Sequence, residues 1–343
     1  MKVARLIKPG EILLEEVAKP QVKKGTEVLL KTLYFGICGS DMQIYHGLHK
    51  YAAMPVIMGH EVAALIEEVG TDVSDYKVGQ KVAVEPQIYC GECYPCQIGR
   101  FNVCENLKVF GVHTDGFNAE YVVCDQKYLH HVPDDMDPQI LALVEPFAVG
   151  VGSAKRSSRL AGGNVCVIGA GTIGNFTAQA AKGLGAKKVL VTDLVDDKLN
   201  YALECGIDYV ENTSKMSLKE AIEKNFGKQK ADVIIDCVGM PIIFEQMLEA
   251  ARPSSDLVVT GNYKKSVTIE MPLIQRQEIS VLGHMMYVRE DYTDAIRLLY
   301  EGKVNTEKII SKVYDFDNYP EAYLYWENNP QDVMKILVNV GDK

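Results

Sequence analysis

The sequence predicts an α/β protein in which a doubly wound parallel sheet is inserted into a β-rich domain. The chain has 343 residues, more than one hydrophobic core usually organises, which favours two domains. Short segments bounded by Gly and Pro fill the chain up to about residue 145, and strands alternating with helices follow. A glycine-rich turn at residues 169–174 joins a strand to a helix in this second region.

The first region has the pattern of an all-β or barrel-like unit. Segments 28–34, 62–70 and 78–84 are rich in apolar and β-branched residues and are separated by Gly- and Pro-containing turns, so each is expected to be a strand. The His130–His131 pair precedes Pro133 and is expected at the surface.

The second region alternates strands with helical stretches, which is typical of a parallel sheet with helices on both faces. The helix after the glycine turn is expected to end near Leu184, and the tail carries a helix at Asp291–Glu301 and a last strand at Met334–Val340. The expected strands of the sheet are 164–168, 188–193, 232–237 and 256–260.

These patterns predict that the nucleotide-binding domain is inserted into the β-rich domain. Residues 1–147 and 287–343 are expected to form the β-rich domain, and residues 148–286 the nucleotide-binding domain.

The composition argues against several classes of partner. A net charge of −10 disfavours nucleic acid and anionic membranes, and no apolar run is long enough to cross a bilayer. The N-terminal segment lacks the apolar core of a signal peptide. Nine cysteines without such a signal suggest a reducing compartment, so the cytoplasm is the expected location.

Four of the cysteines stand close together in the sequence, at positions 90, 93, 96 and 104. Their spacing fits the closed tetrahedral shell of a structural zinc, within a lobe at about residues 88–106. A disulfide pair is the alternative interpretation. A closed zinc site has no open position, so the chemistry is expected elsewhere.

The glycine turn fits a dinucleotide-binding motif. Gly169, Gly171 and Gly174 are spaced as G-x-G-x-x-G around Ala170, Thr172 and Ile173, where a helix N-terminus would face the phosphates. Asp193 ends the next strand, nineteen residues past Gly174, where a carboxylate would accept hydrogen bonds from the ribose hydroxyls and repel a 2′-phosphate. The motif therefore predicts NAD rather than NADP.

A second metal site is expected in the first region. Cys38 in the segment GICGSD, together with His60 and Glu61 in GHE, would provide a thiolate, an imidazole and a carboxylate. Three such ligands leave a fourth position of zinc open for water or substrate. Each residue alone is a weak signal, because a lone Cys is more often a small buried hydrophobe.

With these motifs the chain resembles the zinc-dependent medium-chain dehydrogenase/reductase superfamily over nearly its whole length. The matching segments are GICGSD, GHE, the four-cysteine lobe, GVHTDGFNAEYV, LVEPFAVG, and GAGTIG followed by Asp193. Within the superfamily it looks most like the polyol and sugar-acid dehydrogenases, the sorbitol-like branch. The resemblance implies a GroES-like catalytic domain beside a Rossmann domain, and two zinc ions per chain, one catalytic and one structural.

The resemblance also assigns roles to single residues. Cys38 and His60 are implied as ligands of the catalytic zinc, completed by Glu61 or by Glu145 of LVEPFAVG, with exchange between the two left open. Asp41 would orient His60. Ser40 would take up the proton of the substrate hydroxyl, and Lys198 would join the glycine motif and Asp193 in holding the cofactor.

Two departures from the family pattern concern the substrate. Gln43 replaces a histidine that completes the proton relay in many relatives, so His46 or His49 could substitute, or water could carry the proton. In the stretch Gly283–Tyr287 the tyrosine of a sorbitol-binding Arg-Tyr pair survives, whereas Met286 stands for the arginine. Tyr287, His113 and His46 remain candidates for the substrate pocket.

The sequence therefore predicts an enzyme that transfers a hydride from a secondary alcohol of a polyol, cyclitol or sugar acid to NAD, giving a ketone. An L-threonine 3-dehydrogenase and a sugar-phosphate dehydrogenase like that for galactitol-1-phosphate are the alternatives within the enzyme class. A non-catalytic protein that binds NAD and zinc is the alternative outside it. The resemblance implies a homodimer or homotetramer, paired through an edge strand at 266–269 or 279–282.

Overall fold

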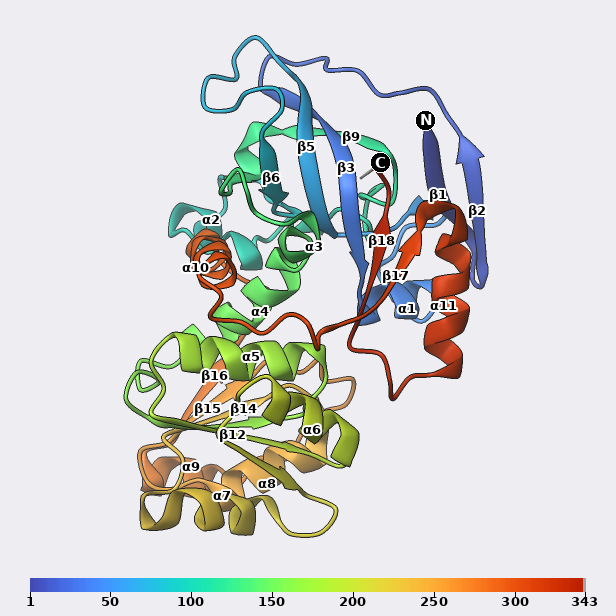
Figure 1. The fold of residues 1–343 in the computed structure, drawn as a ribbon. Helices are drawn as coiled ribbons and strands as arrows, with labels where there is room; N and C mark the ends of the chain where they lie inside the picture. Colours follow the sequence, from blue (N-terminus) through green and yellow to red (C-terminus); the bar gives the residue numbers. More distant parts are fainter. Residues whose placement is uncertain (342–343) are drawn as a thin grey trace. The chain divides into compact units, whose positions relative to one another are not determined.

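The structure, a computed structural model, describes residues 1–341 and divides into two compact units (Figure 1). Met1–Glu145 and the segment that begins at Ile310 form unit 1, and Pro146–Ile309 form unit 2. The return to unit 1 therefore lies at residue 310 and not at the expected residue 287. No helix among residues 1–341 is both long and apolar enough to cross a membrane.

A large sheet organises unit 1 around its longest strand, β3 (Glu27–Ile37). Its order is β10-β6-β5-β3-β18-β17, and β9 also pairs with β3. The last two strands of the chain thus join a sheet built mostly from its first part. The other strands are β5 (Glu61–Val69), β6 (Lys81–Val84), β9 (Tyr121–Asp125), β10 (Leu129–His131), β17 (Ile310–Asp315) and β18 (Lys335–Asn339).

Within residues 1–341, unit 1 also contains two smaller sheets, five α-helical segments and three short 3₁₀ helices, Phe101–Val103, Gln126–Tyr128 and Phe316–Asn318. The sheets are β2-β1-β4 and β7-β8. Their strands are β1 (Lys2–Lys8), β2 (Glu11–Glu16), β4 (Val56–Ile57), β7 (Gln87–Ile88) and β8 (Lys108–Val109). The helices are α1 (Gly39–Tyr45), α2 (Tyr94–Gln97), α3 (Pro138–Leu141), α11 (Tyr319–Asn328) and the start of α4 (Val144–Lys155).

Aromatic side chains fix α11 and α1 against the large sheet. Phe35 of β3 meets Tyr319 of α11 edge to face, with ring centroids 5.3 Å apart, and Tyr323 of α11 lies 4.8 Å from Tyr45 of α1. These rings are buried in one core cluster with Ile37. The cluster holds the end of β3 and helix α1 in place. Cys38 lies between these two elements, and Ser40 and Asp41 lie in the first turn of α1.

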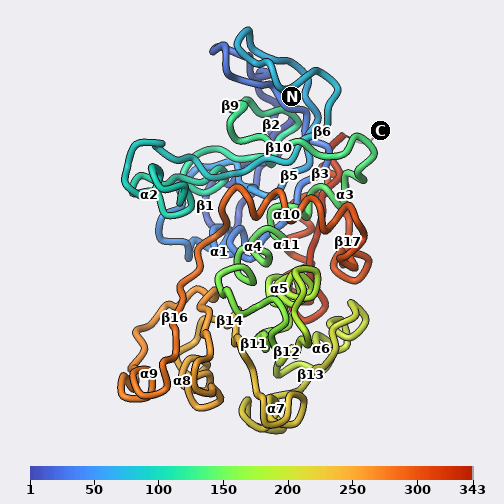
Figure 2. Tube along the Cα trace, turned by 90° about the vertical axis from the view of Figure 1, so that its left-hand side faces the viewer, coloured from blue at the N-terminus to red at the C-terminus, as the bar shows by residue number. Residues whose placement is uncertain are grey.

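Unit 2 contains a six-stranded parallel sheet in the order β13-β12-β11-β14-β15-β16. In the lower part of Figure 2 the labels β16, β14, β11, β12 and β13 follow one another from left to right, in agreement with this order. This is the doubly wound order of a Rossmann domain. The strands are β11 (Asn164–Ile168), β12 (Lys188–Asp193), β13 (Tyr209–Asn212), β14 (Val233–Asp236), β15 (Asp256–Val259) and β16 (Ser280–Gly283).

The helices of unit 2 include one that was expected in the other domain. α10 (Arg289–Tyr300) belongs to unit 2. Its Leu298 packs against Gly183 at the end of α5, and its Asp294 accepts a hydrogen bond of 2.8 Å from Lys155. These contacts place α10 in unit 2, so the domain boundary lies beyond this helix, after Ile309. The others are α5 (Thr172–Gly183), α6 (Asp196–Glu204), α7 (Leu218–Phe226), α8 (Pro241–Ala250) and α9 (Met271–Gln277).

The His130–His131 pair is split between the two faces of β10. His130 is 6% exposed, and its Nε2 lies 3.1 Å from Oε2 of the buried Glu85. His131 is exposed and stacks on Tyr76. The expectation of a surface position was wrong for His130, because neighbouring residues of a strand point to opposite faces.

Candidate metal centres and cofactor site

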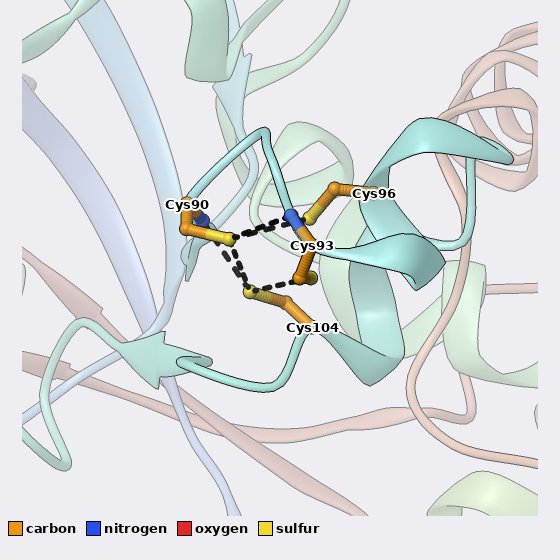
Figure 3. A group of neighbouring side chains, drawn as sticks. All are labelled: Cys90, Cys93, Cys96 and Cys104. Atoms are coloured by element: carbon orange, nitrogen blue, oxygen red, sulfur yellow. Dashed lines mark hydrogen bonds between the residues drawn. The ribbon is translucent and has the colours of Figure 1, made fainter.

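The four-cysteine lobe brings its thiols to one point, as Figure 3 shows. The Sγ atoms of Cys90 and Cys104 are 3.5 Å apart, those of Cys93 and Cys104 3.8 Å, and those of Cys90 and Cys96 4.0 Å. Four thiolates about 2.3 Å from a tetrahedral zinc stand about 3.8 Å from one another, whereas a disulfide needs about 2.05 Å. All four cysteines are free, so the lobe fits zinc and not a disulfide pair.

Backbone amides of the lobe donate to these sulfurs. Cys93 N donates to Cys90 Sγ at 3.4 Å, and the N–H groups of Cys90 and Asn106 donate to Cys104 Sγ at 3.3 Å each. Hydrogen bonds from the backbone of Glu92 and Cys93 lower the pKa of the Cys90 thiol to about 6. Such donors stabilise the thiolate, the form that binds a metal.

A second cluster lies where β3 and β5 run side by side. One ligand atom each of Cys38, His60 and Glu61 lies within 4.8 Å of the others. Cys38 follows the last residue of β3, and Glu61 begins β5 opposite Gly36. A Cβ on Gly36 would overlap Glu61 Oε2, so only glycine leaves room for this carboxylate. The antiparallel register therefore brings the three ligand types together.

Asp41 lies beside the His60 ring. Asp41 Oδ2 accepts a hydrogen bond from Cys38 N at 2.9 Å, and its Oδ1 lies 3.5 Å from His60 Nδ1. His60 Nε2 then faces Ser40, whose Oγ is 3.4 Å away. Burial acts to lower the pKa of His60, but the carboxylate of Asp41 and the Cys38 thiol raise it well above its ordinary value. The orientation leaves Nε2 as the nitrogen that can bind a metal.

Lys335 is a charged residue of this site that the sequence did not indicate. It begins β18, is 2% exposed, and donates from Nζ to Glu61 Oε1 at 2.6 Å, to Glu61 Oε2 at 2.8 Å and to Ile37 O at 3.1 Å. All three N–H groups of the ammonium are therefore used. Burial acts to lower the pKa of Lys335, but the charge of Glu61 raises it above its ordinary value. Glu61, which is fully buried, is thus half of an internal ion pair.

Glu145 approaches the same cluster from the first turn of α4. It is 7% exposed, and its charge acts on both His60 and Lys335. The group of ligand atoms within 4.8 Å contains Glu61 and does not contain Glu145. Of the two candidate carboxylates, Glu61 therefore lies in the cluster and is also bound to Lys335, whereas Glu145 acts on the cluster through its charge.

The three candidate residues of the substrate pocket lie in different surroundings. His46 Nε2 lies 3.3 Å from Glu327 Oε1 on α11, in a partly exposed pair. His113 Nδ1 accepts a hydrogen bond of 3.0 Å from Val109 N. Tyr287 is fully buried in unit 2, where its ring packs edge to face on Tyr292. His113 and His46 thus lie in unit 1, whereas Tyr287 is a core side chain of unit 2.

The glycine turn of unit 2 has the geometry that its motif requires. Gly169 has a φ of +96°, and a Cβ on Gly174 would overlap the carbonyl oxygen of Gly169. Gly171 precedes α5, so the residues after it form the N-terminus of this helix, the end that favours an anion. The turn therefore leaves the space that a pyrophosphate needs.

Asp193 holds the glycine turn to the end of β12. Its Oδ2 accepts a hydrogen bond from Ala170 N at 2.7 Å, and its Oδ1 accepts from Leu194 N at 2.7 Å. The carboxylate is therefore fixed beside the turn, where the ribose of a dinucleotide would lie. Lys198 is partly exposed on α6, the helix that follows.

Comparison with known proteins agrees with this arrangement. Residues 24–134 match the alcohol dehydrogenase GroES-like domain family, and residues 172–301 match the zinc-binding dehydrogenase family. The starvation-sensing protein RspB of Escherichia coli K12 is 33% identical over 344 residues, 100% of each chain. The sorbitol dehydrogenase of Bacillus subtilis is 30% identical over 98% of this chain and 97% of its own. The L-threonine 3-dehydrogenase of Pyrococcus horikoshii is 35% identical over 90% of each.

Solved structures share the whole fold. The RspB structure from E. coli CFT073, complexed with NADH, has a TM-score of 0.92 at 32% identity and covers 99% of both chains. A zinc-binding dehydrogenase from Sinorhizobium meliloti 1021, bound to NADP, has a TM-score of 0.91 at 31% identity over the same shares. The chain therefore belongs to the zinc-dependent medium-chain dehydrogenases of the polyol branch, which are oxidoreductases that use zinc and a nicotinamide dinucleotide.

Proposed function

We propose that the protein oxidises a secondary alcohol of a polyol, cyclitol or sugar acid to a ketone, with reversible hydride transfer to NAD. The observation that carries this proposal is the cluster of Cys38, His60 and a carboxylate with Ser40 at its edge. Relatives named sorbitol dehydrogenase, at 30% and 33% identity, support the substrate class.

Cys38 Sγ and His60 Nε2 are the proposed ligands of the catalytic zinc, with Glu61 or Glu145 as the third. The fit is supported by the buried Asp41 Oδ1 and His60 Nδ1, which have no other hydrogen-bond partner within residues 1–341 and would pair once Nε2 is bound. When bound, zinc supplies Lewis acidity that lowers the pKa of an alcohol hydroxyl.

The residues around the cluster would handle the proton and the charge. Ser40 Oγ, 3.4 Å from His60 Nε2, is placed to accept the substrate's hydroxyl proton and to pass it on. Asp41 keeps the His60 ring in one tautomer, and Lys335 neutralises Glu61. The low exposure of these groups strengthens each of the interactions.

The first test is a panel of substrates. The purified protein is incubated with NAD and with hexitols, aldonates, inositols, hexitol phosphates and threonine, and NADH is followed by its absorbance. Activity on a hexitol, inositol or aldonate is expected. Activity confined to threonine or to a phosphate ester would establish one of the two enzyme alternatives. If a protein loaded with zinc and NAD showed no activity, the hypothesis of a non-catalytic binding protein would be favoured.

The four-cysteine lobe is proposed to hold a second, structural zinc. A Cys93→Ser variant is expected to bind one zinc fewer per chain and to lose about 4 kcal/mol of unfolding free energy, since structural metals contribute directly to folding. NADH formation at 25 °C by the protein that remains folded should stay within about threefold of the wild type. Metal analysis, thermal unfolding and initial rates are the measurements. Cys205→Ser, a partly exposed thiol in unit 2, is the control, and unchanged zinc content in Cys93→Ser would contradict the assignment.

Asp193 is proposed to set the preference for NAD, together with contacts from Gly169–Gly174 and Lys198. An Asp193→Asn variant keeps the size of the side chain but removes the charge that repels a 2′-phosphate. The ratio of kcat/KM for NAD to that for NADP is expected to fall about 100-fold, or about 2.7 kcal/mol. Asp196→Asn, whose carboxylate pairs with Lys215 at the surface, is the control. An unchanged ratio would remove Asp193 from the cofactor site.

A homodimer or homotetramer is proposed, paired through β16. This strand bonds only to β15 within the sheet and leaves Val281 41% exposed, whereas residues 266–269 form no strand. An unpaired strand edge is a template for a second copy. The four free thiols of the lobe suit a reducing compartment, which is why we propose a cytoplasmic enzyme.

A further inference from the structure

Three segments of unit 1 that carry histidines are joined by backbone hydrogen bonds beside the catalytic cluster. The loop after α1 turns back on itself, because the N–H groups of Leu48 and His49 both donate to Gln43 O, at 2.8 and 3.2 Å. The same loop is tied to the second segment by Ala53 N, which donates to Val112 O at 2.8 Å. His49 is therefore fixed near the segment that carries His113.

The second segment is in turn tied to the strand that leads to His60. Gly116 N donates to Ile57 O at 2.7 Å, and Phe117 N donates to Gly59 O at 3.1 Å. The backbone segments that carry His49, His113 and His60 are thus joined to one another. Burial first, and then the nearby rings of His113 and His60, lower the pKa of His49. The effect of these two rings on the pKa of His49 agrees with the position that the backbone hydrogen bonds give to His49.

His49 and His113 each have a ring nitrogen that could contact a ligand. His113 Nδ1 accepts a hydrogen bond from Val109 N at 3.0 Å, which leaves Nε2 as the donor of this ring. His49 Nδ1 is buried and has no hydrogen-bond partner in the described chain. Buried polar atoms are normally hydrogen-bonded, so a bound ligand is expected to supply the missing hydrogen-bond partner of His49 Nδ1.

We infer that His49 and His113 form a hydroxyl-recognition pair, which binds a second hydroxyl group on the carbon next to the reacting carbinol. A neutral imidazole offers one donor and one acceptor, and a hydroxyl group can use both. The inference rests on the proposed function and adds that the substrate carries a hydroxyl group on the carbon next to the reacting carbinol.

The test compares two alcohols that differ only in the adjacent hydroxyl, (2R,3R)-butane-2,3-diol and butan-2-ol. For the wild type, kcat/KM is expected to be higher with the diol. His49→Leu and His113→Leu should each lower the ratio of kcat/KM for the diol to kcat/KM for butan-2-ol about 10-fold, since one hydrogen bond to the second hydroxyl group is lost. His49→Gln, which retains a donor and an acceptor, should recover part of the loss.

Each other outcome has a defined meaning. His131→Leu, an exposed histidine on β10, is the control, and zinc content and melting temperature show that the variants are folded. Variants that keep the full preference for the diol, or that lose activity on both alcohols equally, would overturn the hydroxyl-recognition pair while leaving the proposed function intact. A wild type that oxidises threonine but neither alcohol would overturn the proposed function and the pair together.

Discussion

Replacing Cys38 by Ser is expected to reduce NADH formation about 1,000-fold, or about 4 kcal/mol in transition-state free energy. The serine hydroxyl is not a thiolate at neutral pH and is a weak zinc ligand, so the open site would lose its metal. Zinc content should fall by one ion per chain while the four-cysteine lobe keeps the other. Metal analysis and steady-state rates on one preparation measure both effects.

The matching control is Cys124→Ser, a fully buried thiol on β9 that lies in a separate core cluster. It is expected to lower stability, because a hydroxyl is buried, and to leave zinc content unchanged. Far-ultraviolet circular dichroism of Cys38→Ser should match the wild type. Full turnover by Cys38→Ser would overturn the assignment of the catalytic metal centre.

Lys335→Met is expected to destabilise the protein by about 3–5 kcal/mol, because it leaves the carboxylate of Glu61 buried without its counter-charge. Denaturant unfolding of the zinc-free protein measures the effect without a contribution from the metal. The double variant Lys335→Met/Glu61→Gln removes both charges and should recover more than half of the lost free energy.

Lys303→Met, an exposed lysine between α10 and β17, should change the unfolding free energy by at most about 0.5 kcal/mol. If Lys335→Met unfolded no more easily than this control, the ion pair with Glu61 would not be a determinant of stability. Equal destabilisation in the single and double variants would instead point to lost packing of the lysine stem.

The sequence identified those parts of the fold and site that are local. The expected strands 188–193 and 164–168 coincide with β12 and β11, and Cys38, His60 and the glycine turn could be found from short motifs. β13 was missed, because Tyr209–Asn212 is a short edge strand with two polar residues in four and thus lacks an apolar run. The expected strand at 266–269 is irregular, although it contains β-branched residues.

The counter-charge of the buried Glu61 could not be predicted from short motifs. Lys335 stands before the apolar run of the last strand, where a lysine usually lies at the surface. Its burial depends on Glu61 across the sheet, and only the pairing of β18 with β3 makes the two meet. The same holds for His130, whose burial depends on Glu85. A polar residue's burial is decided by partners that are distant in the sequence.

The ion pair between Glu61 and Lys335 joins residues 274 positions apart, and this bears on how the chain is made. Residues 146–309 are continuous and can fold as they leave the ribosome, since domains generally fold as units during synthesis. Unit 1 is completed by β17 and β18, which are translated after unit 2. Until Lys335 has been added Glu61 lacks its counter-charge, so a nascent chain that already contains all of unit 2 is still unfinished at the site of its chemistry.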